Sequence, residues 1–531
     1  MGETTRRVPA RWSGALAALL SASAVAAAGA QAAGSEVVVA RTVGNGDTAM
    51  VTGGSSGLGA AAWLERTGKR TALRTAIVRD GRLTGRQTVV SGRRDRMPAV
   101  VGITVDARGT QRLLFGDERR GEHLRLRLVE RRGTGAWSRP VTVATASVGG
   151  MIEDRVEAGI ATHPSGRTVV IWCEGGQARN VLDTRHPGTI RTRVLHGGRW
   201  SAARRLWKGQ FCSATSVQTA PDGFLAEWFG EPVELEDSPH SFARADARGR
   251  FGRPHGLQSF ADAGTAQMHA APIAGGSLLL GAGPLPTDDG RLIRVGTASA
   301  RGLLTADAVV PMPSAEQTQG GWVGAGGPID VVGPVGTPAQ STVVYATAEG
   351  RRDGGADIGG IWAATGSAAA GWSVAAVDPF AAAGPSGAAN HGDGTALDLD
   401  ELADGTPVAT WGVGSGAPCT VQYFQSMRGA SGWGPRTLVA ERRTASQSCQ
   451  ADTPRALPDA GLIEVEAQWA RSSLWATVSG RGAAPAPVVQ LRTTTWNAVR
   501  RAGALELTCA VPGGGVCHVS LVPRAAGRRC L

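Results

Sequence analysis

Gly135-Ala136-Trp137-Ser138 and Gly198-Arg199-Trp200-Ser201 are two copies of one motif, and this motif decides the fold. Each copy reads as a glycine turn that opens a short strand. Looser copies occur at Gly371-Trp372-Ser373, Gly432-Trp433-Gly434, Gly81-Arg82-Leu83, Gly249-Arg250-Phe251 and Gly302-Leu303-Leu304. The apolar position of the motif recurs about every 58 residues, which is typical of a repeat architecture.

A second motif alternates with the first and consists of a glycine turn followed by an apolar run that ends in Trp. The run after Gly166 ends at Trp172, and the run after Gly223 ends at Trp228. Similar runs end at Trp63, Trp411 and Trp469. The runs are rich in β-branched and aromatic residues, which favour strands, and they predict the second strand signal of each unit.

Each unit therefore reads as about four short antiparallel strands. A lone sheet of this size cannot bury both of its faces, whereas units stacked around an axis can. We predict an all-β chain that forms a β-propeller of seven or eight four-stranded blades. The last unit, around Trp469, lacks one strand, and Glu36-Val37-Val38-Val39-Ala40 could supply it and close the ring. Most Trp side chains are expected to pack between blades.

The composition of the 531-residue chain changes along its length and predicts four segments. Residues 1–32 combine arginines, a small-residue apolar stretch and the sequence Ala30-Gln31-Ala32, which predicts a signal peptide cleaved after Ala32. Residues 33–479 would form the propeller, and residues 480–488 a stiff Ala- and Pro-rich linker. Residues 489–531 are expected to form a small β module with strands at Leu505–Cys509 and Cys517–Leu521. No later stretch is long and apolar enough to span a membrane.

The seven cysteines fit an oxidising compartment outside the cytoplasm. None forms a C-x-x-C motif and no histidine cluster has metal-ligand spacing, so we expect no metal and no cofactor. The expected disulfides are Cys173–Cys212, Cys419–Cys449 and Cys509–Cys517, with Cys530 left over. The first two pairs should join equivalent places, from the end of one Trp-containing strand to the start of the next unit.

The net charge of +11 comes almost wholly from arginine, since Lys69 and Lys208 are the only lysines. These arginines are scattered along the chain and mixed with acids, whereas a nucleic-acid binder concentrates its basic residues. We therefore expect no nucleic-acid partner, and a monomer whose partner is a cell-surface glycan or a protein.

With these residues in view, the chain resembles the secreted β-propeller repeat proteins of actinobacteria, an uncharacterised group. Their units carry the Gly-x-Trp-Ser-x-Pro strand seen here as Gly135 to Pro140. The tail from Leu505 to Leu521 is similar to the small Cys-bearing β modules of such proteins. The resemblance implies the fold and export, and it implies no reaction.

The glycine-rich stretch from Val51 to Gly59 looks like the dinucleotide loop of short-chain dehydrogenases. That family also needs a Tyr followed four residues later by Lys, but Tyr345 is followed by Glu349 and Tyr423 by Met427. We therefore interpret the stretch as a β-turn.

Catalytic residues are not identified by any motif. A glycosidase would need two carboxylates on either side of its substrate. Acidic candidates are Asp398, Asp400, Glu401, Asp404, Glu234, Glu236 and Asp237. Histidines expected in loops or at strand ends are His163, His186, His196, His240, His255 and His269.

The leading hypothesis is an exported propeller that acts as a binding or scaffold protein for a glycan, a cell-wall polymer or a protein. The alternative is a carbohydrate-active hydrolase or lyase with carboxylates near the propeller axis. A ligand, a blade number and a site remain open at this point.

Overall fold

The computed structural model describes the chain as strands joined by turns, and its described residues contain no helix. The described residues are 36–41, 49–52, 58–67, 70–79, 82–93, 99–120, 123–147, 157–175, 188–209, 212–230, 240–256, 267–284, 291–311, 328–350, 356–378, 396–401, 405–415, 419–444, 455–457, 461–468, 473–479, 488–491, 507–510, 524–525 and 528–529. The search for a helix that is long and apolar enough to cross a membrane found none in this part of the chain. The chain divides into two compact units, one of residues Gly34–Gly482 and one of residues Met1–Ala33 with Ala483–Leu531.

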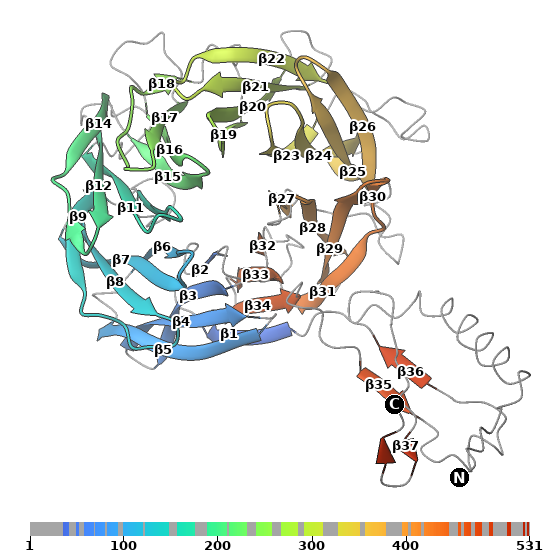
Figure 1. Ribbon diagram of the computed structural model, residues 1–531, viewed down its shortest axis with the longest axis horizontal. Coiled ribbons are helices and arrows are strands. Elements are labelled where there is room, and N and C mark those ends of the chain that lie inside the picture. Colours follow the sequence, from blue (N-terminus) through green and yellow to red (C-terminus); the bar gives the residue numbers. More distant parts are fainter. Residues whose placement is uncertain are drawn as a thin grey trace, which may run out of the picture. The chain divides into compact units, whose positions relative to one another are not determined.

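The larger unit is an eight-bladed β-propeller (Figure 1), so the prediction of seven or eight blades is confirmed with eight. Each blade is an antiparallel sheet whose strands follow one another from the ring interior outward. Blade 1 consists of β2 (Ala49–Thr52), β3 (Leu58–Thr67), β4 (Arg70–Arg79) and β5 (Arg82–Arg93). Blade 2 consists of β6 (Ala99–Val105), β7 (Thr110–Arg120), β8 (His123–Arg132) and β9 (Val141–Ser147). Blade 3 consists of β10 (Ala158–Thr162), β11 (Thr168–Gly175), β12 (Gly188–His196), β13 (Arg199–Trp200) and β14 (Arg204–Gly209).

The next four blades repeat this order. Blade 4 consists of β15 (Ser213–Ala220), β16 (Gly223–Phe229), β17 (His240–Asp246) and β18 (His255–Gly256). Blade 5 consists of β19 (Gln267–Ile273), β20 (Gly276–Pro284), β21 (Arg291–Ser299) and β22 (Leu304–Val310). Blade 6 consists of β23 (Pro328–Gly336), β24 (Ser341–Gly350), β25 (Ala356–Ser367) and β26 (Gly371–Asp378). Blade 7 consists of β27 (Ala396–Glu401), β28 (Pro407–Ser415), β29 (Cys419–Gly429), β30 (Gly432–Trp433) and β31 (Thr437–Thr444).

Blade 8 is assembled from both ends of this unit. It contains β32 (Arg455–Leu457), β33 (Gly461–Gln468), β34 (Ser473–Ser479) and, at its outer edge, β1 (Glu36–Arg41). The predicted closing strand is confirmed, because Val37 lies opposite Ala476 and Val38 opposite Trp475 in an antiparallel ladder. The closure gives an otherwise open edge a partner and holds the first and last parts of the unit together.

The two sequence motifs occupy fixed places in a blade. The Trp-ended run is the second strand, and the Gly-x-Trp motif precedes or begins the outermost strand. Trp63, Trp228 and Trp411 are at most 1% exposed, so they seal seams between blades, as the packing role predicts. Trp228 contacts residues of blade 3 and Trp411 contacts residues of blade 6, which shows that each second-strand Trp faces the preceding blade.

The C-terminal unit contains two short hairpins, β35 (Val488–Leu491) with β36 (Leu507–Ala510), and β37 (Arg524–Ala525) with β38 (Arg528–Arg529). The strand expected near Cys509 is present and pairs with Val488–Leu491, while the predicted segment from Cys517 lies outside the described residues. The run Val488-Val489-Gln490-Leu491 has the β-branched, alternating pattern of a strand. The predicted linker ended one residue too late, at Val488, because Pro residues lie just before it.

Candidate functional site

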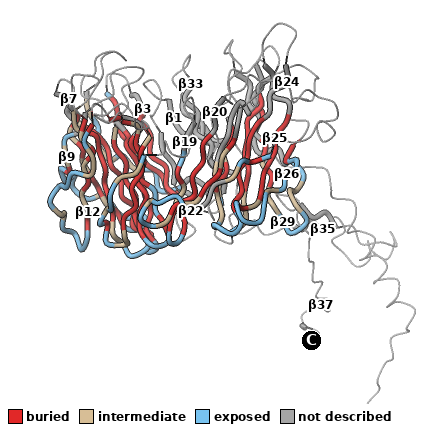
Figure 2. Tube along the Cα trace, turned by 90° about the horizontal axis from the view of Figure 1, so that it is seen from above, coloured by how far each residue is buried: buried red, intermediate tan, exposed pale blue. Residues whose placement is uncertain are grey.

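The two ends of the propeller's blades are built differently. At one end, here the turn end, turns such as 106–109, 163–167 and 274–275 join the first strand of a blade to the second. At the other end of the blades, called the long-connection end, the chain runs from the second strand of a blade to the third, and from one blade to the next. The longest connections between consecutive propeller strands, 311–327 and 379–395, both start and finish at the long-connection end. Figure 2 shows the buried strands and the exposed turns at one edge of the blades.

Hydrogen bonds between neighbouring blades fasten the turn end. The imidazole Nε2 of His163 lies 3.3 Å from the carbonyl oxygen of Pro221 in the next blade. The backbone N–H of Gly275 donates to the Asp222 carboxylate at 3.0 Å, and that of Gly336 donates to the Glu401 carboxylate at 3.1 Å. These hydrogen bonds hold the turns of neighbouring blades together at this end.

The bonds of His163 also define its tautomer. Because Nε2 faces a carbonyl oxygen, Nε2 carries the proton and donates. Nδ1 then accepts from the backbone N–H of Ser165, 3.2 Å away. Both nitrogens are used within the turns, so His163 has a structural role.

At the long-connection end, the seam between blades 4 and 5 contains a buried acid, Glu227. Glu227 lies on β16 two residues beyond Leu225, which packs against Ala270 of blade 5. The side chain is 8% exposed and accepts a hydrogen bond from the backbone N–H of Ala270. Burial raises the pKa of Glu227 to about 8, and the hydrogen bond only partly offsets it. The carboxyl group is therefore protonated at neutral pH and can donate a hydrogen bond.

Two histidines lie at the same end of the same two blades. His240 is the first residue of β17 and its ring meets that of Phe229 edge-on, with the centroids 4.8 Å apart. His269 is the third residue of the innermost strand β19, and its side chain is exposed. Partial desolvation lowers the pKa of both imidazoles, and the nearby His269 lowers that of His240 further. Both rings are neutral at pH 7, so they offer donors and acceptors without charge.

Glu227, Phe229, His240 and His269 together are called the seam cluster below. All four lie within three residues of the strand ends at the long-connection end of blades 4 and 5. At pH 7 the cluster is neutral, aromatic and able to form hydrogen bonds, which suits an uncharged polar ligand. A search for groups of three or more potential metal ligands found none among the described residues.

The acidic residues predicted from sequence fall in different places. Asp398 and Asp400 lie half-buried on the innermost strand β27 of blade 7, where they alternate with buried Leu397 and Leu399. Blades 4 and 7 are not neighbours in the ring, so Glu227 and Asp398 do not form an adjacent pair. Glu401 binds Gly336 at the turn end and is a structural residue. Asp404, Glu234, Glu236 and Asp237 lie outside the described residues.

The other predicted histidines do not join the seam cluster. His196 ends β12 at the turn end and is exposed. His255 lies in the outermost strand β18, with its ring centroid 5.9 Å from that of Phe242. His186 lies outside the described residues.

The structure contains the expected disulfide between Cys173 of β11 and Cys212, the residue before β15, with their Cα atoms 5.9 Å apart. It staples blade 3 to blade 4. Cys419 begins the third strand of blade 7, directly after the Trp411 strand, and Cys173 lies near the end of the second strand of blade 3, so both lie at the long-connection end. The Cys419–Cys449 pair stays a prediction. Cys449, Cys517 and Cys530 lie outside the described residues, and Cys509 lies opposite Val489 in the C-terminal hairpin.

The glycine-rich stretch between Val51 and Gly59 joins two antiparallel strands, β2 and β3. A dinucleotide loop leads from a strand into a helix, whose N-terminus binds the pyrophosphate. Here the chain continues into a ten-residue strand, β3, and not into a helix, so the dehydrogenase pattern is absent; residues 53–57 themselves lie outside the described residues.

Glu227 was not among the site residues predicted from the sequence. Its signal is a single acid inside the run Phe224-Leu225-Ala226-Glu227-Trp228, where both neighbours are apolar. The equivalent position before the strand Trp is Ile171 in blade 3 and Thr410 in blade 7, and both are buried. An acid at a position that the repeat buries is a reason to suspect function.

No protein-family model matches this chain, and no curated protein matches it. Among solved structures, Sqt1 from Chaetomium thermophilum is similar over 85% of this chain and 99% of its own, with 11% identity and a TM-score of 0.42. The GH93 α-L-arabinofuranosidase of Fusarium graminearum is similar over 72% of this chain and 91% of its own, with 10% identity and a TM-score of 0.32. A thermostable family-43 glycoside hydrolase covers 57% of this chain, with 98% of its own length, 13% identity and a TM-score of 0.30.

Proposed function

We propose that this chain is an exported β-propeller that binds a glycan, a cell-wall polymer or a protein at the long-connection end of its blades. The observation that carries the proposal is the position of the seam cluster. Neighbouring blades are joined at both ends, by hydrogen bonds between turns at the turn end and by the Cys173–Cys212 disulfide and the Thr215–Glu157 hydrogen bond at the other. The seam cluster lies at the long-connection end and offers neutral polar and aromatic groups there. Binding residues are disproportionately found on loops that a rigid scaffold positions.

The side chains at each end support this position. The large second-strand Trp residues are buried in seams and offer no ring face to a ligand. Exposed His269 on the innermost strand, with the Phe229–His240 ring pair beside its seam, offers contacts without a net charge at pH 7. A neutral glycan or a peptide backbone matches this chemistry better than an anionic polymer does.

Export is part of the proposal and rests on the sequence of residues 1–32 and on the Cys173–Cys212 disulfide. Disulfides of this kind persist in oxidising compartments. Detecting the protein outside the cytoplasm with a new N-terminus at Ala33 would support export, and recovery of the intact leader in the cytoplasmic fraction would contradict it.

The test of binding uses the secreted, oxidised chain on arrays of bacterial glycans, cell-wall fragments and surface peptides. Any ligand found is then titrated against His269→Ala, which removes an exposed ring, and His196→Ala, an exposed histidine at the turn end, as the matched control. We expect at least about a tenfold loss of affinity for the first variant, which corresponds to a hot-spot contact of about 1.4 kcal/mol or more. Equal affinities for both variants would contradict a site at the long-connection end.

A second function is favoured by one specific observation, the protonated Glu227. A carboxyl group with a pKa of about 8 is suited to donate a proton to a leaving group, as a glycoside hydrolase or lyase requires. Incubation with polysaccharides and a search for new product masses tests this. Products that appear with the natural chain and disappear with Glu227→Gln would establish the enzyme, while products unaffected by that change would remove Glu227 from the reaction.

A further inference from the structure

The seam between blades 4 and 5 lacks a pair of side chains that five other seams contain. In those seams, the aromatic residue of a second strand packs in one buried cluster with the residue just before the aromatic position of the preceding blade. Trp228 and Ile171 form this pair between blades 3 and 4. The pairs in the other four seams are Phe115 with Ala62, Trp172 with Leu114, Tyr345 with Leu280, and Trp411 with Val344.

Blade 5 has a glycine at the aromatic position. Gly223 and Gly276 begin the second strands of blades 4 and 5 directly after the turn. Five residues later, blade 4 has Trp228 and blade 5 has Gly281. The residue before the aromatic position in blade 4 is Glu227, so this seam has a glycine and an acid where the other five have a ring and an apolar side chain.

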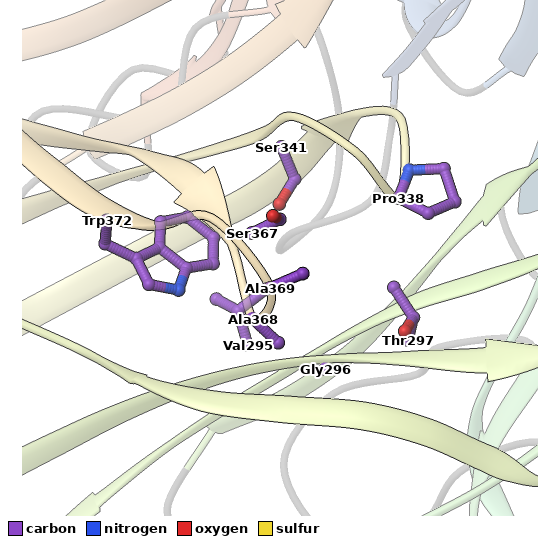
Figure 3. Close-up of a pocket in the computed structure, with 9 residues that line it drawn as sticks. All are labelled: Val295, Gly296, Thr297, Pro338, Ser341, Ser367, Ala368, Ala369 and Trp372. Atoms are coloured by element: carbon purple, nitrogen blue, oxygen red, sulfur yellow. The ribbon is translucent and has the colours of Figure 1, made fainter.

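The Gly-x-Trp motif of blade 5 does not supply a ring either. In blade 6 the motif ring, Trp372, packs against the cluster that contains Val295 of blade 5, beside the small pocket shown in Figure 3. The same position in blade 5 is Leu303, which is 61% exposed. Among the described residues, the buried cluster between blades 4 and 5 has no aromatic ring from blade 5; its members are Leu225, Phe242, Ala270, Leu279 and Ala298.

An arginine next to Gly281 does not replace the missing ring. Arg294 lies opposite Gly281 on the neighbouring strand and has an interaction of its own. Blades 1 to 3 have an arginine at the same place in addition to the ring: Arg74 opposite Trp63, Arg127 opposite Phe115 and Arg191 opposite Trp172. Blade 5 has therefore lost the ring without gaining a large side chain at the arginine position.

Blade 4 presents polar and aromatic groups to this part of the seam. Glu227 and Phe229 project from β16 toward blade 5, because they alternate with Trp228, which faces blade 3. The next strand places His240 opposite Phe229 in the ladder, and the two half-buried rings meet edge-on.

Glu227 has a hydrogen-bond donor to offer in this seam. The backbone N–H of Ala270 donates to its carboxyl group and uses one of the two oxygens. Glu227 makes no second hydrogen bond within the described part of the chain, and neither carboxyl oxygen is among the buried side-chain atoms that lack a partner. The other oxygen is therefore in contact with solvent, through the 8% of the residue that is exposed, and its proton can be donated to a ligand.

We propose that the ring of a neutral sugar binds in this seam, at the long-connection end of blades 4 and 5, in the place of the missing aromatic side chain. A pyranose ring has about the width of a six-membered aromatic ring. Its hydroxyl groups accept from the O–H of Glu227, and its apolar face packs against the ring pair of Phe229 and His240. The inference rests on the proposed function, because it assigns a ligand class and a place to the same end of the blades.

The first test asks whether the seam has room for a ring and needs no ligand. Gly281 lies in a regular antiparallel ladder, so Gly281→Trp requires no change of the backbone. We expect the Tm of this variant to equal or exceed that of the natural chain. A fall of about 2 °C or more, the cost of overpacking, would show that other side chains fill the place and would overturn the proposal.

The second test titrates the natural chain with the methyl pyranosides of glucose, galactose, mannose, xylose and arabinose, observed by saturation-transfer NMR. We expect saturable binding of at least one of them, and an affinity that is at least about tenfold weaker in Gly281→Trp. Leu303→Trp is the matched control, because it adds a ring to the same blade at the turn end, and it should leave the affinity unchanged.

Absence of saturable binding by every methyl pyranoside, or an affinity that Gly281→Trp leaves unchanged, would contradict the inference. These outcomes are distinguishable from failure of the proposed function. A ligand from the arrays that loses affinity in His269→Ala and keeps it in Gly281→Trp would overturn the sugar site in the seam and still support binding at the long-connection end.

Discussion

Replacing Glu227 by Gln should stabilise the propeller, and the gain should grow with pH. The pKa of Glu227 is raised from 4.5 to about 8 by burial. Below pH 4 the group is protonated in both the folded and the unfolded chain, so the pKa difference has no effect there. Between pH 4.5 and 8 only the folded chain keeps the proton, so the stability of the natural protein falls as the pH rises. Gln keeps the shape and an amide oxygen for the Ala270 N–H, and it does not ionise.

The size of the effect follows from the shift in pKa. Each unit is worth about 1.4 kcal/mol, so the natural protein loses about 4 to 5 kcal/mol in total between pH 4 and pH 9. At pH 7 the loss is about 3 kcal/mol. A unit of about 450 residues unfolds with an entropy near 1 kcal/mol per degree, so Glu227→Gln should raise Tm by about 3 °C at pH 7.

Thermal unfolding of both proteins by calorimetry from pH 4 to pH 9 measures this. The difference in Tm should be small at pH 4 and largest above pH 8. Glu65→Gln is the matched control, because Glu65 is a partly exposed strand acid paired with Arg74 at 2.8 Å, and its loss should change the stability by less than about 1 kcal/mol. A Tm difference that does not vary with pH, or that becomes smaller as the pH rises, would refute the assignment of Glu227 as a buried acid.

Three further changes test the frame of the propeller. Gly249→Ala should destabilise the propeller more than Gly166→Ala. Both glycines have a positive φ, but only at Gly249 would a Cβ come within 2.8 Å of a neighbouring side chain. By chemical denaturation we expect the free energy of unfolding to fall by about 1 kcal/mol for Gly166→Ala and by at least twice that for Gly249→Ala. Cys173→Ser opens a disulfide that spans 39 residues and should cost about 3 to 4 kcal/mol, lowering Tm under oxidising conditions and not under strong reduction. Deletion of β1 removes the outer strand of blade 8, and limited proteolysis should then cut blade 8 first; uniform resistance would contradict closure by that strand.

Much of the propeller could be predicted because its signals are local and repeated. In three copies of the Gly-x-Trp motif the glycine has a positive φ, at Gly198, Gly371 and Gly432, and an aromatic ring follows it. Since every blade has the same packing arrangement, the motif recurs about every 58 residues and predicts seven or eight blades. The missing strand of blade 8 was predictable because a ring with one short blade leaves an open edge.

The seam cluster could not be predicted in the same way. Glu227 meets Ala270 across a seam, and the sequence carries no signal for which face of β16 meets the next blade. The position of Cys419 relative to its Trp strand was predictable, but its pairing with Cys449 stays a prediction because Cys449 lies outside the described residues.

The division between the two ends of the blades is the central claim, and a paired measurement of binding and melting on two variants tests it most directly. Asp222→Asn weakens the turn end, where Asp222 accepts from Gly275 and pairs with the buried Arg244, whereas His269→Ala changes the long-connection end. We expect Asp222→Asn to lower Tm by about 1 to 3 °C and leave ligand affinity unchanged. His269→Ala should leave Tm unchanged and weaken binding at least about tenfold. Loss of binding in Asp222→Asn with full binding in His269→Ala would contradict the account.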